Sequence, residues 1–130
     1  MTTAILSALP EEQSGLVGSL EQARRVTHAG RAFWQGVLHG KPVVLALSGM
    51  GKVAAATTAT VLVERFGVAR IVFTGVAGGL GDGVRVGDVV VALDYVPHDM
   101  DVSPLFQRWH VPGYAGVRLP CDAGLSAHLS

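Results

Sequence analysis

The sequence predicts an α/β fold, a three-layer sandwich with a mixed β-sheet at its centre. Three short apolar runs, each closed by glycine or proline, are typical of strands that are buried on both faces. These runs are residues 4–9, 42–47 and 70–73. Segments with helical character lie between them, so that strands and helices alternate along the chain.

The first run leads directly into the predicted start of a helix. Pro10 suits the first position of a helix, and Glu11 and Glu12 suit its positive end. We expect this helix to continue to about Gln22.

A hairpin and a second helix follow. Residues 31–38, the turn at residues 39–41 and the apolar run that comes next predict two antiparallel strands. Residues 52–66 are rich in alanine and end at Gly67, which is a good stop signal for a helix.

The last part of the chain predicts one more strand and one more helix. Residues 88–93 form a fourth apolar run, and residues 122–124 open a segment in which Leu125 and Leu129 lie four positions apart. Because the sequence stops soon after this helix begins, we expect residues 1–130 to be the N-terminal portion of a longer domain. The alternative is a short terminal helix.

Composition narrows the class of protein. The 130 residues predict one domain, and 49% apolar with 15% charged residues excludes a disordered chain. Ten basic and ten acidic side chains cancel, so neither nucleic acid nor a membrane surface is an expected partner. Cys121 has no second cysteine to pair with, and no apolar run reaches the roughly 20 residues that span a bilayer. We expect a cytoplasmic protein.

Ligands of open α/β sheets bind beyond the carboxyl ends of the strands. Four polar or glycine-rich turns occupy such positions and are expected to converge on one pocket: residues 8–12, 48–52, 74–80 and 98–101. Glu11 and Glu12 are paired carboxylates, which suit either acid–base catalysis or the start of a helix.

These turns fit no standard cofactor motif. Residues 48–52 are not a phosphate loop, because their glycines flank a single residue and Val53 follows the lysine. Residues 74–79 do not follow the dinucleotide pattern, although their glycines allow a flat ligand to approach the backbone or serve a loop with positive φ. Residues 98–101 have no partner cluster elsewhere, so no metal site is predicted.

Taken together, the motifs resemble the bacterial 5′-methylthioadenosine/S-adenosylhomocysteine nucleosidases, a branch of the purine nucleoside and uridine phosphorylase superfamily. The matching stretches are residues 8–12, 48–56, 74–80, 86–90 and 98–102. The resemblance implies a phosphorylase/hydrolase-like fold, of which this chain would be the N-terminal part.

The resemblance also implies an activity and a site. The family hydrolyses the bond between adenine and ribose without a cofactor, in methionine salvage, and Glu12 falls on the glutamate that positions and deprotonates the attacking water. The implied substrate contacts are Val76, Ala77 and Gly78 near the base and sugar, Met50 and Val102 around the 5′-alkylthio group, and Phe106 reaching the neighbouring subunit of a homodimer.

Hydrolysis is favoured over phosphorolysis. Phe73 stands where the phosphorylases carry a basic residue, and residues 10–12 replace their glycine-rich, arginine-bearing loop.

The chain departs from the family at Val76, where a serine is frequent. The family's ribose-binding Met-Glu pair and adenine-protonating aspartate fall beyond this sequence. The alternatives are a nucleosidase for another 6-substituted purine nucleoside, a nucleoside phosphorylase, and a non-catalytic or truncated nucleoside-binding or dimerisation module.

Overall fold

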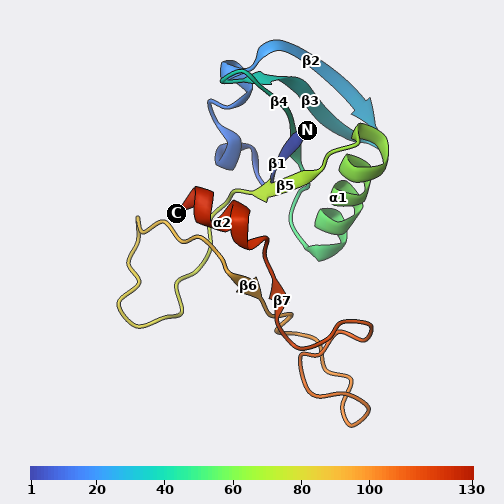
Figure 1. The fold of residues 1–130 in the computed structure, drawn as a ribbon, viewed down its shortest axis with the longest axis vertical. Helices are drawn as coiled ribbons and strands as arrows, with labels where there is room; N and C mark the ends of the chain where they lie inside the picture. Colours follow the sequence, from blue (N-terminus) through green and yellow to red (C-terminus); the bar gives the residue numbers. More distant parts are fainter. The chain divides into compact units, whose positions relative to one another are not determined.

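The computed structural model describes residues 1–130, which divide into a sheet unit (residues 1–78) and a C-terminal unit (residues 79–130). The sheet unit holds five strands in the order β2-β3-β4-β1-β5 (Figure 1). Their bounds are β1 Thr3–Ser7, β2 Glu21–His28, β3 Arg31–Leu38, β4 Lys41–Leu47 and β5 Arg70–Phe73. β1 runs parallel to β4 and β5, whereas β2 and β3 are antiparallel additions. This mixed sheet confirms the predicted fold class.

Both faces of the sheet are covered, because successive side chains of a strand point to opposite faces. One face packs against helix α1 (Lys52–Phe66), and the other packs against the segment that contains the 3₁₀ helices η1 (Pro10–Gln13) and η2 (Val17–Ser19). The first core contains Ala4, Leu6, Phe33, Val44, Ala46 and Leu62, and the second contains Leu20, Val43 and Leu45. The apolar runs of β1 and β4 therefore mark strands that are buried on two sides, as predicted, whereas β5 is only partly buried and its Phe73 is 52% exposed.

The predicted hairpin is confirmed. β3 and β4 pair from Leu38 opposite Lys41, and the turn residues His39 and Gly40 have φ of 48° and 75°. Two-residue turns with positive φ at both positions match the twist of the strands that they join. Ala29 and Gly30 repeat this geometry between β2 and β3, with φ of 48° and 72°.

The helix predicted from Pro10 to about Gln22 is wrong. Only two short 3₁₀ turns form, and β2 already begins at Glu21. Gly15 has φ of 88°, which is incompatible with a right-handed helix, and Gly18 lowers the helix propensity further. Pairing with β3 then gives the residues from Glu21 onward their backbone hydrogen bonds.

Helix α1 has the bounds that the sequence predicts. Gly67 follows it with φ of 61°, and its N–H donates to the carbonyl oxygens of Leu62 and Val63. The rings of Phe33 and Phe66 lie 4.6 Å apart between β3 and the end of the helix. None of the helices combines the length and the apolar character that crossing a bilayer requires.

The C-terminal unit is sparse in regular structure. β6 (Asp94–Tyr95) pairs with β7 (Leu119–Pro120). Helix α2 (Ala123–Leu129) is capped by the preceding Asp122, whose side chain accepts a hydrogen bond from the Leu125 N–H. This helix confirms the prediction. The predicted strand at residues 88–93 is wrong: a single backbone hydrogen bond, from the Cys121 N–H to the Leu93 carbonyl oxygen, reaches the end of this run, no ladder forms, and Val89 is 92% exposed.

The first core gives a direct test of the sheet unit. Replacing the fully buried Leu62 by alanine leaves a cavity between α1 and the sheet, and we expect it to lower the free energy of unfolding by about 2–5 kcal/mol. The neighbouring Val63→Ala removes a side chain that is 47% exposed and is expected to change it by less than about 0.5 kcal/mol. Urea unfolding followed by far-UV circular dichroism measures both, and equal losses would contradict the packing described.

Candidate active site

The ends of three parallel strands are fastened to one another. The Ser48 N–H donates to the Ser7 carbonyl oxygen at 2.8 Å, and the Thr74 N–H donates to the Leu6 carbonyl oxygen at 2.9 Å. The hydroxyl oxygens of Ser7 and Thr74 lie 2.8 Å apart. The turns that follow β1, β4 and β5 are therefore brought to one edge of the sheet, as the sequence predicts for these three.

The Glu12 carboxylate connects two of these turns. Its Oε2 accepts hydrogen bonds from the backbone N–H groups of Ala8 (2.8 Å) and Leu9 (2.9 Å), which follow β1. Its Oε1 accepts from the N–H of Val76 (3.1 Å), which follows β5. The side chain thus folds back from η1 and lies at the junction of the strand ends.

These donors keep Glu12 ionised. The backbone N–H of Leu9, followed by that of Val76, holds the pKa of the Glu12 carboxyl below its ordinary value of 4.5; the N–H of Ala8 acts in the same direction, and partial burial opposes them. Hydrogen bonds to the charged form of an acid favour that form. At neutral pH the site presents an oriented negative charge that can hold a water molecule and attract a developing cation.

Gly75 makes room for this carboxylate. A Cβ atom at Gly75 would lie 2.8 Å from Glu12 Oε1 and 3.1 Å from Cε1 of Phe73. Sequence reasoning leaves two interpretations of the glycines in this loop: space for a flat ligand, or a loop with positive φ. At Gly75 the space is occupied by the protein's own carboxylate instead.

Gln13 is a further residue of this region that sequence reasoning missed. Its side chain is only 5% exposed, and Nε2 donates to the carbonyl oxygens of Ile5 and Ala46, each at 2.9 Å. The only signal in the sequence is a polar residue where the first turn of a predicted helix faces the sheet. That signal does not distinguish a buried amide from an exposed one.

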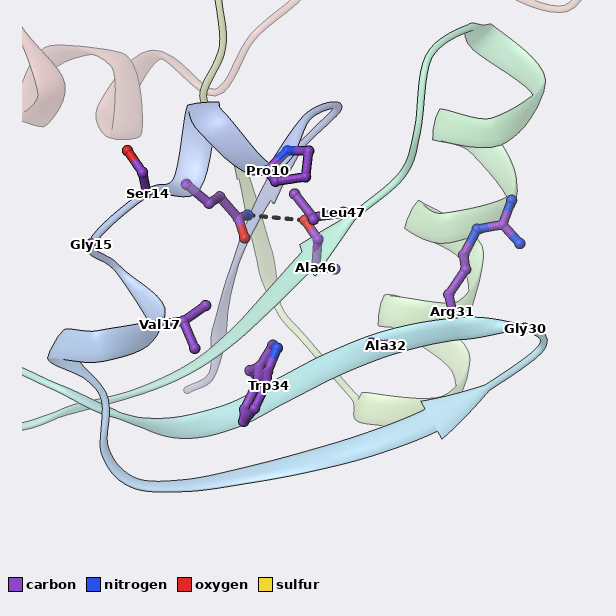
Figure 2. A pocket seen from close by; sticks show the side chains of 11 residues that line it. Pro10, Ser14, Gly15, Val17, Gly30, Arg31, Ala32, Trp34, Ala46 and Leu47 are labelled. Carbon is purple, nitrogen blue, oxygen red and sulfur yellow. Dashed lines mark hydrogen bonds between the residues drawn. The ribbon is translucent and has the colours of Figure 1, made fainter.

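A cavity of about 450 Å³ lies beside Gln13, between the segment with η1 and η2 and the strands β3 and β4. Figure 2 shows Pro10 and Leu47 near one end of it, and Val17 and Trp34 farther along. It lies on the sheet face opposite α1, and neither Glu12 nor any predicted substrate contact lines it.

The remaining predicted site residues of the sheet unit lie on exposed turns. Met50 (78% exposed) follows β4, and Val76 (84% exposed), Ala77 and Gly78 follow β5. The structure thus brings Glu12 and Val76 into contact and leaves the other three open to solvent on the adjoining turns. Their contact with a substrate stays a prediction.

Val102 and Phe106 belong to the C-terminal unit, so their place relative to Glu12 also stays a prediction. The Phe106 ring stacks on His110, with centroids 5.1 Å apart. In the same loop Asp101 accepts hydrogen bonds from the hydroxyl (2.7 Å) and the N–H (3.1 Å) of Ser103, and these, the hydroxyl first, lower the pKa of its carboxyl.

Comparison with known proteins identifies similar chains. The sequence model of the phosphorylase superfamily matches residues 2–130. A 5′-methylthioadenosine/S-adenosylhomocysteine nucleosidase of Bacillus thuringiensis is 41% identical over 114 residues, which are 87% of this chain and 49% of that protein. The chain spans about half the length of the curated relatives that it matches.

Solved structures agree with this similarity. A nucleosidase of the same name from Colwellia psychrerythraea, in complex with adenine, superposes with a TM-score of 0.94 and 36% identity, over 98% of this chain and 52% of that one. The futalosine hydrolase of Helicobacter pylori superposes with a TM-score of 0.88 and 30% identity, over 98% of this chain and 55% of that one.

The close approach at Gly75 predicts a change in the titration of Glu12. In Gly75→Ala the new methyl group displaces Oε1, so the Val76 N–H is lost as a donor and the pKa of Glu12 rises toward 4.5. The hydrogen-bonded carboxylate stabilises the fold in full above its ordinary pKa of 4.5, and this contribution is lost as the pH falls through the lowered pKa of the folded protein. Because the two pKa values lie closer together in the variant, the variant should gain less stability from Glu12 at neutral pH and lose less of it on acidification.

Carboxyl ¹³C chemical shifts recorded between about pH 2 and pH 7, a range that brackets the usual glutamate value, measure this pKa. Gly78→Ala is the matched control, because a Cβ there meets no atom within 4 Å. An unchanged pKa in Gly75→Ala would show that the carboxylate does not depend on this contact.

Proposed function

The chain belongs to the phosphorylase superfamily, and from this premise we propose that it is the N-terminal portion of a purine nucleosidase. The proposed reaction is hydrolysis of the adenine–ribose bond of 5′-methylthioadenosine and S-adenosylhomocysteine. The observation that carries the proposal is the Glu12 carboxylate, which three backbone N–H groups hold ionised where β1 and β5 end. The names of the similar proteins support the choice of substrate.

In the proposed mechanism the bond between the sugar carbon and the adenine nitrogen breaks first. Its electron pair leaves with the base, which takes up a proton from a group outside residues 1–130, and positive charge develops on the sugar. Water then attacks the sugar carbon and transfers a proton to Glu12, so that a free sugar and adenine result. Because the lowered pKa makes Glu12 a weak base, it accepts this proton only as the new carbon–oxygen bond forms and the water becomes acidic.

The other proposed contacts follow the resemblance. Val76, Ala77 and Gly78 would lie against base and sugar, and Met50 and Val102 against the 5′-alkylthio group. Phe106 would enter the site of a second subunit in a homodimer. The group that protonates adenine and the groups that bind the ribose hydroxyls would come from outside residues 1–130. We place the protein in the cytoplasm and in methionine salvage.

Two features favour water over phosphate as the nucleophile. The negative charge of Glu12 repels an anion at the place where the nucleophile would stand. Phe73, the last residue of β5, contributes an uncharged ring beside Gly75.

A second candidate activity is hydrolysis of another purine nucleoside, which the similarity to a futalosine hydrolase supports. Steady-state comparison of 5′-methylthioadenosine, S-adenosylhomocysteine and futalosine as substrates decides between them.

Glu12→Gln tests the proposed role of the carboxylate. Glutamine retains the shape but accepts no proton from water, so we expect kcat in the complete gene product to fall by about 10²–10⁴-fold while adenine still binds. Adenine release and calorimetric titration with adenine measure the two effects. Glu11→Gln changes an exposed carboxylate on the same 3₁₀ helix and should leave kcat within about twofold. Near-normal turnover by Glu12→Gln would reduce Glu12 to a structural role.

The nucleophile can be identified from the products. With inorganic phosphate present, adenine release should not accelerate beyond what an equal ionic strength of sodium sulfate produces, because the carboxylate excludes the anion. The sugar product should be the free sugar and not its 1-phosphate. Detection of a sugar 1-phosphate by ³¹P nuclear magnetic resonance would assign the protein to the phosphorylases instead.

A further inference from the structure

We infer that Gln13 is a positioning residue for Glu12: its buried carboxamide fastens η1 to the sheet and thereby holds the neighbouring Glu12 carboxylate in position. The consequence for catalysis rests on the proposed function, whereas the geometric consequence does not. Gln13 is not among the site residues that the sequence predicts.

The amide engages two strands at once. Nε2 donates to Ile5 O in β1 and to Ala46 O in β4, at 2.9 Å each. A primary amide nitrogen carries two hydrogens, so both donors are used on backbone acceptors. β1 and β4 are the parallel pair whose ends carry two of the candidate turns.

Apart from the hydrogen bonds of Glu12 itself, the buried contact of η1 with the sheet comes from Gln13. Gln13 is the one buried residue of this four-residue 3₁₀ helix, and the cavity of about 450 Å³ opens beside it. A single turn of 3₁₀ helix is not stable alone, because its nucleation fixes several dihedral angles for few hydrogen bonds. The two amide hydrogen bonds therefore replace the apolar packing that normally anchors such a turn.

The position of Glu12 depends on that anchor. Oε2 bonds to N–H groups in the turn that directly precedes η1, so these contacts can move together with it. Oε1 bonds to Val76 N, 64 positions along the chain, and this contact requires η1 to sit at a fixed place relative to β5. A displacement of about 1 Å at a reacting group costs on the order of 10²-fold in rate.

Two substitutions of nearly equal size test the inference in the complete gene product. Gln13→Met removes both donors and retains the length of the side chain. We expect kcat to fall about 10–100-fold with KM within about threefold, because the carboxylate is misplaced while the substrate contacts persist. Gln13→Glu should behave similarly at neutral pH and recover relative to Gln13→Met as the pH is lowered, because a protonated carboxyl regains one donor.

Thr58→Val is the matched control. It deletes a fully buried hydroxyl that donates to Ala54 O at 2.8 Å within α1, a hydrogen bond that does not involve η1. The control should lower stability and leave kcat within about twofold. Equal losses of kcat in Gln13→Met and Thr58→Val, in proportion to the unfolded fraction, would overturn the inference.

A second readout does not need the activity. In Gln13→Met the carboxyl ¹³C titration should show the pKa of Glu12 raised toward 4.5, because the Val76 N–H no longer reaches Oε1. If the parent protein releases no adenine but this pKa rises, the proposed function fails and the positioning role stands. If Gln13→Met does not fold, Gln13→Leu, which also removes both donors and adds no charge, serves for both measurements. An unchanged pKa with unchanged kcat in a folded variant overturns the inference.

Discussion

The parallel pairing of β1 with both of its neighbours determines where every functional group of the sheet unit lies. Ser7 is opposite Leu47 of β4, and Leu6 is opposite Phe73 of β5, so the three strands finish almost level. Chain segments that are distant in sequence then leave the sheet at one edge, with their backbone N–H groups without ladder partners. The Glu12 carboxylate satisfies three of those groups. The catalytic candidate is thus also part of what joins the strand ends, and its charge and its structural role cannot be separated.

This double role has an electrostatic consequence. Each backbone donor that orients the carboxylate also weakens it as a base, since the same hydrogen bonds stabilise its charged form. Attack by water on an uncharged carbon would need a strong base to remove the proton of the water. A carbon that already carries positive charge needs only a fixed anion and a late proton acceptor. The local chemistry of the site therefore fits cleavage in which the leaving group departs early.

The sequence permitted prediction of those elements whose signals are local. Helix α1 has an alanine-rich body and a terminal glycine, β5 is an apolar run closed by Thr74 and Gly75, and the hairpin has its glycine turn. The choice of Glu12, and of the end of the sheet on which it lies, came from the polar turns that follow the strands and from the family resemblance. Two predicted elements failed: Gly15 interrupts the helix expected at residues 10–22 before pairing with β3 begins at Glu21, and residues 88–93 form no strand. The roles of Gln13 and Gly75 were not predicted, because they arise from contacts with other segments of the chain.

The cavity beneath η1 has a consequence for spectroscopy. The indole of Trp34 lines it (Figure 2). The other tryptophan of the chain, Trp109, belongs to the C-terminal unit. Indole emission shifts to longer wavelength as water gains access to the ring, so the emission of Trp34 reports on how closely the η1 segment covers the strands. The molecule therefore contains a native fluorophore next to the segment that carries its candidate catalytic carboxylate, and motion of that segment can be followed without an attached label.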